Sequence, residues 1–230
     1  MATDHQYQEK LAVAKAAVAF VKPNNIVGLG TGSTAILAIN ELAKLMKEGL
    51  PIVGVPSSVA TKALATSLEI PLLELGKVHH IDISIDGADE FTENLDLIKG
   101  GGGALFREKI VASLSRNRII ITDSSKKVSK LGFFKVPVEI NPNAYQYVLN
   151  EIEKLNGISD LRIVKNEIFI TDNGNYIIDA DFGLIDHPEK LAHSLNQVEG
   201  ILAHGIFIGL TDMILMARDG EIVTFIKSEY

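Results

Sequence analysis

Apolar residues in the first half of the chain alternate between two spacings, which predicts helices that take turns with short strands. Helical spacing marks four ranges: 6–21, 34–47, 57–68 and 104–115. Compact or alternating apolar runs predict strands at 26–29, 52–55, 81–86 and 118–122, with a brief extended piece at 71–75. Strands joined by crossover helices give a mostly parallel sheet covered on both faces. This half is therefore expected to be α/β.

From about Gly132 the regular alternation of strand and helix patterns stops, and the sequence predicts mostly short strands. The expected elements are a linker around Pro137 and Pro142, a helix at 144–155, strands at 161–170 and 175–179 about the turn Asp172-Asn173-Gly174, a helix from Pro188 to about Gln197, an apolar run at 201–210, and two strands between Asp212 and Ile226 about the turn Asp219-Gly220. The pattern predicts a second, smaller α+β domain.

Composition narrows the class of protein. Of 230 residues, 47% are hydrophobic and 22% charged, as in ordinary globular proteins. The net charge of −7 disfavours generic binding to nucleic acid or to an acidic membrane. With no cysteine, the chain has no disulfide, thiolate nucleophile or cysteine metal site. The N-terminus has no signal-peptide layout, because Lys15 and Lys22 interrupt its apolar run. We expect a cytoplasmic protein with no nucleic-acid or membrane partner.

The loop Gly28-Leu29-Gly30-Thr31-Gly32-Ser33-Thr34 follows a strand and opens a helix, a setting suited to holding an anion on helix N-terminal amides. It is not a dinucleotide fingerprint, because Ser33 occupies the third glycine position. Nor is it a P-loop, because no lysine precedes Ser33 or Thr34. Two interpretations stay open: a cradle for one phosphate, or a tight turn in which Thr34 is the N-cap.

A second motif runs from Ile85 to Lys109. It holds three carboxylates (Asp86, Asp89 and Glu90), Lys99, the glycines 100–103, and Glu108 early in a helix. Carboxylates suit proton transfer, a lysine can face a developing negative charge, and bare glycine backbone lets a ligand approach amide groups. The alternatives are a solvated acidic loop or a Mg²⁺ site, which Lys99 disfavours. Because ligands bind beyond the carboxyl ends of parallel strands, we expect both motifs in one cleft.

The remaining candidate site residues have weaker signals in the sequence than these two motifs. Lys126 or Lys127 follows a strand and can meet a phosphate or a substrate hydroxyl, or simply lie on the surface. The six histidines lack metal-ligand spacing, and no Ser-His-Asp order accompanies a nucleophile elbow. The residues together fit metal-free, cofactor-free proton transfer next to a carbonyl in a sugar phosphate.

Four ordered motifs carry a resemblance to a known family: GLGTGST (28–34), SIDGADE (84–90), IKGGGGAL with REK (98–109) and TDSSK (122–126), with TDNGN (171–175) in addition. Together they resemble ribose-5-phosphate isomerase of type A. The resemblance implies interconversion of D-ribose 5-phosphate and D-ribulose 5-phosphate through an enediolate, in the non-oxidative branch of the pentose phosphate pathway. It implies no metal, no cofactor, and a homodimer or homotetramer.

The resemblance also implies residue roles. Glu108 is the base, Asp86 assists ring opening, Asp89 positions substrate hydroxyls, and Lys99 with neighbouring amides stabilises the oxyanion. The implied substrate-binding residues are Thr31, Gly32, Ser33, Thr34, Asp86, Gly87, Ala88, Asp89, Lys99, Gly100, Gly101, Gly102 and Lys126, with Lys10 a weaker candidate for the phosphate. A carboxylate screened from water can have its pKa raised, which makes it a better base.

The implied architecture is a Rossmann-like domain, 1–130 plus 208–230, with an α+β domain at 131–207. A competing class is a sugar-phosphate-sensing domain without catalysis. Such a regulator carries a basic helix-turn-helix, for which the first 25 residues are too short. Acyl-CoA transfer with a glutamate nucleophile is a second alternative, which normally needs a longer chain.

Overall fold

A computed structural model describes residues 4–226, and within them the chain forms two compact units. The first unit runs to Ala88, then from Ile110 to Lys126, and again from Gly209. The second comprises Asp89–Lys109 and Lys127–Ile208. The predicted domain limits assign 89–109 to the first domain, whereas here the strands of that segment pair within the second unit. Residues 1–3 and 227–230 of the predicted first domain lie outside the described part.

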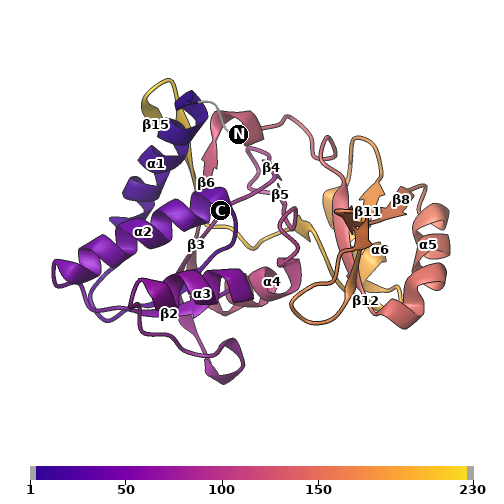
Figure 1. The fold of residues 1–230 in the computed structure, drawn as a ribbon. Helices are drawn as coiled ribbons and strands as arrows, with labels where there is room; N and C mark the ends of the chain where they lie inside the picture. Colours follow the sequence, from indigo (N-terminus) through magenta and orange to yellow (C-terminus); the bar gives the residue numbers. More distant parts are fainter. Residues whose placement is uncertain (1–3, 227–230) are drawn as a thin grey trace. The chain divides into compact units, whose positions relative to one another are not determined.

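A six-stranded sheet in the order β15-β14-β6-β3-β1-β2 forms the first unit (Figure 1). Neighbours from β2 to β14 are parallel, and β15 is antiparallel to β14. The strands are β1 (Ile26–Leu29), β2 (Val53–Pro56), β3 (Ile81–Asp86), β6 (Ser115–Asp123), β14 (Met213–Arg218) and β15 (Glu221–Ile226). The predicted α/β class with a mostly parallel sheet is confirmed.

Helices cover both faces of this sheet. On one face α1 (Asp4–Val18), α2 (Ser33–Lys47) and α3 (Val59–Ser67) share a core with β1, β3, β6 and β14. On the other face Val111 of α4 (Leu105–Leu114) packs with Val55 and Ile81. Gly28 permits this packing, because a Cβ there would lie 2.6 Å from Cγ1 of Val111. The alternation of strand residues thus gives the sheet two buried faces.

The second unit contains an antiparallel sheet in the order β12-β7-β11-β8. One face packs on α5 and α6; from the other, Ile177 contacts Leu105 at the start of α4. The bounds are β7 (Val136–Ile140), β8 (Ile158–Leu161), β11 (Tyr176–Asp181), β12 (Ile201–His204), α5 (Tyr145–Lys154) and α6 (Pro188–Asn196). The smaller sheets are β13-β5-β4 and β10-β9, with β4 (Glu90–Phe91), β5 (Leu97–Ile98), β9 (Ile163–Val164), β10 (Glu167–Ile168) and β13 (Ile206–Phe207). Short 3-10 helices occupy Leu75–Lys77, Ser124–Lys126 and Pro142–Ala144.

Two predictions for this unit are wrong. The linker expected around Pro137 is β7, a fully buried strand in the interior of the sheet. Proline is tolerated there because the β12 ladder ends at Val138, so the next position needs no N–H on that side. The single strand expected at 161–170 is instead split by a turn at Lys165-Asn166, where both residues have positive φ. Asparagine tolerates this conformation better than most residues do.

None of the helices among residues 4–226 is both long enough and apolar enough to cross a membrane.

Candidate active site

The loop after β1 opens helix α2 directly. Gly32 has φ 106°, a left-handed conformation that glycine adopts at little cost, and the helix begins at Ser33. Thr34 lies in the first turn, so the interpretation of Thr34 as N-cap is wrong. Gly32 occupies the cap position and supplies no side-chain cap. The first backbone N–H groups of α2 therefore lack a side-chain cap and can bind an anion.

Asp86, at the end of β3, holds this loop in place. Its Oδ1 accepts hydrogen bonds from the backbone N–H of Thr31 (3.0 Å) and of Gly87 (2.8 Å). A Cβ on Gly30 would lie 2.2 Å from the same oxygen and 2.6 Å from the Cα of Asp86. The chain therefore needs glycine at position 30, so that the aspartate can approach the loop.

Beneath the loop, four hydroxyl groups form a neutral cluster. The Thr31 hydroxyl lies 2.8 Å from that of Ser57 and donates to that of Ser58 at 2.9 Å. Thr61 in turn donates to the carbonyl oxygen of Gly30 at 2.9 Å. Ser58 is also the N-cap of α3, accepting from the N–H of Thr61. The cluster fixes Thr31 on the first turn of α3 without any charged side chain.

Lys10 of α1 contacts the first residue of α2. Its Nζ donates to the Ser33 hydroxyl at 3.0 Å and lies 3.8 Å from Oδ2 of Asp123. Asp123, at the end of β6, is 1% exposed. The sequence motifs include neither Lys10 nor a role for Asp123, because only the fold brings α1 to the end of β6. Lys126 ends the 3-10 helix Ser124–Lys126, which follows Asp123 directly in the chain.

In the second unit, Lys99 and Glu108 form a buried ion pair. Nζ of Lys99 lies 3.3 Å from Oε2 of Glu108, and each residue is 4% exposed. Lys99 follows β5, where its backbone N–H donates to the carbonyl oxygen of Gly205 at 2.9 Å. The close approach explains glycine at 205, where a Cβ would lie 2.3 Å from the Lys99 oxygen. The pair places a carboxylate base and an ammonium group together, screened from water.

The four glycines between this lysine and α4 form a shaped turn. The N–H of Gly103 donates to the carbonyl oxygen of Gly100, and both residues have positive φ. Asp89 closes the turn from the side, because its Oδ2 accepts from the N–H of Gly101 at 2.8 Å. The predicted shaped turn is confirmed, and it carries exposed backbone at Gly101 and Gly102.

Contacts from distant segments fix the start of α4. A Cβ on Gly103 would lie 2.5 Å from the Phe169 ring, so that ring packs directly on the turn. Arg107 donates to Oδ1 of Asn173 at 2.9 Å and to the carbonyl oxygen of Asp172 at 3.1 Å. Arg107 therefore faces the 172–173 turn, while Glu108, one position on, pairs with Lys99. Motif TDNGN thus supports the helix that carries the predicted base.

Below that turn, Glu139 is 1% exposed. Its Oε1 accepts from the Thr171 hydroxyl (2.9 Å) and from the side-chain amides of Asn173 (3.2 Å) and Asn175 (2.8 Å). This carboxylate is a structural anchor that the sequence did not reveal.

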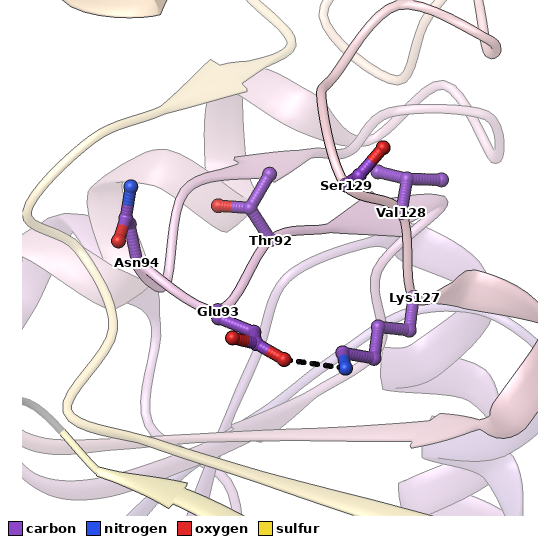
Figure 2. A pocket seen from close by; sticks show the side chains of 6 residues that line it. All are labelled: Thr92, Glu93, Asn94, Lys127, Val128 and Ser129. Carbon is purple, nitrogen blue, oxygen red and sulfur yellow. Dashed lines mark hydrogen bonds and ion pairs between the residues drawn. The ribbon is translucent and has the colours of Figure 1, made fainter.

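The third acidic residue of the second motif has a structural role. Glu90 is 4% exposed and accepts from the backbone N–H groups of Gly132 (2.9 Å) and Phe134. Beside it, Lys127 pairs with Glu93 at 2.6 Å, which favours Lys126 over Lys127 for a phosphate role. This ion pair lies at an open pocket of about 450 Å³ lined by Thr92, Glu93, Asn94, Lys127, Val128 and Ser129 (Figure 2).

Lys109, half-buried and next to Glu108 in the chain, contacts the backbone of buried His204. Burial lowers the pKa of Lys109 to about 8, although its Nζ donates to the carbonyl oxygens of His204 (2.8 Å) and Ile206 (3.0 Å). Burial, with the charge of Lys109, lowers the pKa of His204 to about 3. The imidazole is therefore neutral at physiological pH.

Within residues 4–226, no three His, Asp or Glu side chains are arranged to hold a metal ion. The predicted site residues form two groups. The first unit holds Thr31, Gly32, Ser33, Thr34, Asp86, Gly87, Ala88 and Lys126; the second holds Asp89, Lys99, Gly100, Gly101, Gly102 and Glu108. Strands β1, β3 and β6 are neighbours in one sheet, so the first group gathers at the carboxyl edge. Convergence of both groups in one cleft stays a prediction.

Known proteins resemble this chain along nearly its full length. The family model for ribose 5-phosphate isomerase A (phosphoriboisomerase A) matches residues 53–221. Ribose-5-phosphate isomerase A 2 of Oceanobacillus iheyensis is 40% identical over 222 residues, which cover 94% of this chain and 97% of the relative.

Two solved structures agree in fold. Ribose 5-phosphate isomerase from Plasmodium falciparum has a TM-score of 0.93 and 40% identity, covering 97% of this chain and 100% of that one. A D-ribose-5-phosphate isomerase in complex with phospho-erythronic acid has a TM-score of 0.92 and 38% identity, covering 95% of this chain and 98% of that one. The resemblance read from the motifs is confirmed. The chain belongs to the ribose 5-phosphate isomerase A family.

Proposed function

We propose that this protein interconverts D-ribose 5-phosphate and D-ribulose 5-phosphate through an enediolate. The observation that carries the proposal is the Lys99–Glu108 pair, 3.3 Å apart and buried, at the end of a glycine turn with exposed backbone. Such an aldose–ketose exchange needs one base near two adjacent carbons and a positive charge near two adjacent oxygens. Family membership gives this chemistry its substrate class.

Glu108 is the proposed base. It removes the proton from C2, and the electron pair of that bond moves toward the C1 carbonyl oxygen. The same carboxyl group then returns that proton to C1, while the hydroxyl proton on the C2 oxygen passes to the C1 oxygen and the carbonyl forms at C2. Lys99 and the amides of Gly100, Gly101 and Gly102 are proposed to stabilise the negative oxygen in between. Fixed donors of this kind act without reorganisation, which is why they lower the barrier strongly.

The first unit is proposed to hold the phosphate and to act on the sugar ring. The helix N-terminus and hydroxyls at Thr31, Gly32, Ser33 and Thr34 suit a dianion, with positive charge from Lys126 and Lys10. Asp86 is proposed to take the proton of the C1 hydroxyl as the bond between C1 and the ring oxygen breaks, and to pass it to the released oxygen, with Gly87 and Ala88 lining the substrate. Asp89 is proposed to position substrate hydroxyls.

Phospho-erythronic acid, bound by one relative, supports this assignment. It is a phosphorylated four-carbon acid, and its carboxylate places negative charge on two oxygens, as an enediolate does. A protein that stabilises the intermediate should bind such an acid more tightly than the substrate. We propose the same preference for this chain.

Several further properties are proposed from the same membership. The reaction needs no metal and no cofactor, the protein is a homodimer or homotetramer, and it acts in the cytoplasm within the non-oxidative pentose phosphate pathway. The absence of cysteine from the sequence fits a reducing compartment.

Proton NMR of the EDTA-treated protein with ribose 5-phosphate in D₂O tests the function. Appearance of ribulose 5-phosphate, with deuterium incorporated at the carbon that receives the proton, is the expected result. Binding of the sugar phosphate without conversion would contradict the proposal and indicate a sensor. Activity that is lost with EDTA and restored by a divalent cation would contradict metal independence alone.

A further inference from the structure

Arg162 binds the glycine turn from a strand-connecting segment far away in sequence. Its Nη1 donates to the carbonyl oxygens of Gly100 (3.0 Å) and Gly101 (3.1 Å). Its Nε and Nη2 form a two-point pair with Asp179 of β11, in which Nε lies 2.8 Å from Oδ2. One guanidinium therefore connects the sheet of the second unit to two successive peptides of the turn.

Those two contacts determine where the amides of the turn point. In a trans peptide the C=O and N–H groups point in opposite directions. Because the carbonyls of Gly100 and Gly101 both face Arg162, the N–H groups of Gly101 and Gly102 face away from it. The N–H of Gly101 indeed donates to Asp89 on that side. The N–H of Gly102 has no acceptor within residues 4–226, and Gly102 is exposed.

The Arg162 backbone and its planar guanidinium group are themselves held by several contacts. The backbone N–H of Arg162 donates to the Ile177 oxygen at 2.8 Å, and its carbonyl oxygen accepts from Phe169 at 2.9 Å. The guanidinium carbon lies 5.8 Å from the centre of the Phe169 ring, which also packs on Gly103. Arginine suits this place because its planar fork can serve a carboxylate and carbonyls together, which an ammonium group cannot do.

We propose that Arg162 is a positioning residue for the isomerisation: it keeps the Gly101 amide on Asp89 and orients the Gly102 amide toward the oxyanion that forms during proton transfer. This inference rests on the proposed function and extends it to a residue outside the motifs. Four glycines in a row would otherwise sample many backbone conformations. The Arg162–Asp179 pair fixes one of them before the substrate binds, so the amides need no reorganisation in the transition state.

The test is Arg162→Lys, with Arg118→Lys as its matched control. Arg118 makes the same kind of fork in the first unit: Nε and Nη2 bind Asp212 at 2.8 and 2.7 Å, and Nη1 donates to the Gly209 oxygen at 3.0 Å. It contacts no proposed site residue. Each variant keeps its positive charge and loses the fork.

Steady-state kinetics with ribose 5-phosphate and the inhibition constant of phospho-erythronic acid are measured for wild type and both variants. Removing a single oxyanion donor typically lowers kcat by about 10²–10³-fold, so displaced amides should cost roughly 10–100-fold. For Arg162→Lys we expect that loss in kcat, little change in KM, and weaker binding of the acid. Arg118→Lys should leave all three values unchanged.

Equal kcat losses in the two variants, or an effect of Arg162→Lys on KM alone, would overturn the assignment. Inactive wild-type protein would overturn the proposed function itself, so the two failures are distinguishable. If Arg162→Lys does not fold by circular dichroism, Asp179→Asn replaces it. That variant keeps the arginine and weakens its anchor, and an unchanged kcat there would equally overturn the role of the fork.

Discussion

The two glycine loops of this protein are tied down in the same way but supported differently. Asp86 accepts a hydrogen bond from the Thr31 N–H in the first loop, and Asp89 accepts one from the Gly101 N–H in the second. The two aspartates are three positions apart in the chain. Below the first loop lies a cluster of neutral hydroxyls, whereas the second is clamped by Arg162 and adjoins the Lys99–Glu108 pair.

The difference matches the charges that each loop is proposed to meet. A phosphate is charged before, during and after the reaction, so helix amides and hydroxyls suffice to hold it. An enediolate exists only during the reaction, and full charges fixed in a dry environment stabilise it most. The first loop is therefore interpreted as a binding device and the second as a catalytic one.

Replacing Glu108 by glutamine should have the largest effect. The substitution removes the proposed base but keeps its size and an oxygen that can face Lys99. We expect kcat to fall by at least about 10³-fold, because general base catalysis and the coupling to Lys99 are lost together. KM should change little, whereas the melting temperature should fall, because the buried Lys99 ammonium loses its counter-charge. Kinetics and calorimetry measure all three.

Glu93→Gln is the control for that variant. Glu93 also pairs with a lysine, Lys127 at 2.6 Å, but at the exposed pocket shown in Figure 2. Exposed pairs contribute little, so neither stability nor kcat should change. A well-folded Glu108→Gln protein that turns over at the control's rate would remove Glu108 from the base role.

Lys99→Met comes next and acts on stability as well as on turnover. It leaves the Glu108 carboxylate buried without the lysine, and breaking one side of a buried pair costs about 3–5 kcal/mol. The double variant Lys99→Met/Glu108→Gln should regain much of that free energy of unfolding, though not activity. Urea denaturation measures both, and a double variant no more stable than Lys99→Met would show that the loss has another origin.

Elements whose signals are local could be predicted from the sequence. Strands β1 and β3 match the predicted ranges 26–29 and 81–86, because each is a short apolar run ended by glycine or by a polar site residue. Strand β7 was missed because Pro137 and Pro142 suggest a linker, and nothing local shows that Val138 ends a ladder. The two-residue strands β4 and β5 are too short for any periodicity.

The same distinction holds in the site. Glu108 and Asp86 could be identified because each stands in a recognisable motif, although Asp86 also binds Thr31, 55 positions away. Arg162 and Glu139 were missed because their partners are about 30 to 60 positions away, and a lone arginine or glutamate in a strand-rich segment resembles a surface residue. Only the fold brings these contacts together.

Alanine at the two loop glycines separates binding geometry from catalysis. At Gly30 an added Cβ meets both Oδ1 (2.2 Å) and Cα (2.6 Å) of Asp86, so backbone must shift and we expect a loss of about 1–3 kcal/mol in stability. At Gly101 the three nearest atoms all belong to the Asp89 carboxylate, the closest at 2.7 Å, and this side chain can rotate. Gly101→Ala should therefore keep its stability and lose kcat.

Thermal melting and kinetics of the two variants decide this comparison. Gly76→Ala is a neutral control, because a Cβ there meets nothing within 4 Å. If Gly101→Ala is as destabilised as Gly30→Ala with normal kcat, the second loop is structural and the contrast between the loops is lost.

The smallest expected effect is the loss of stability at acidic pH, and it should loosen the second loop before the first. The folded pKa of His204 is about 3, below its ordinary value of 6.5, because of burial and the charge of Lys109. As the pH falls through 6.5 the unfolded chain binds a proton that the folded chain does not, so stability is lost progressively down to pH 3. Between pH 7 and 5.5 the expected loss is about 1 kcal/mol. Urea denaturation at these two pH values should show this loss in wild type and not in His204→Asn, whose side chain does not titrate.

Because Gly205, next to His204, binds the backbone of Lys99, amide exchange at 99–103 should rise before exchange at 30–34 as the pH falls. Equal rises in both loops would mean that acid acts on the protein as a whole. The second loop would then depend on its distant contacts no more than the first loop does.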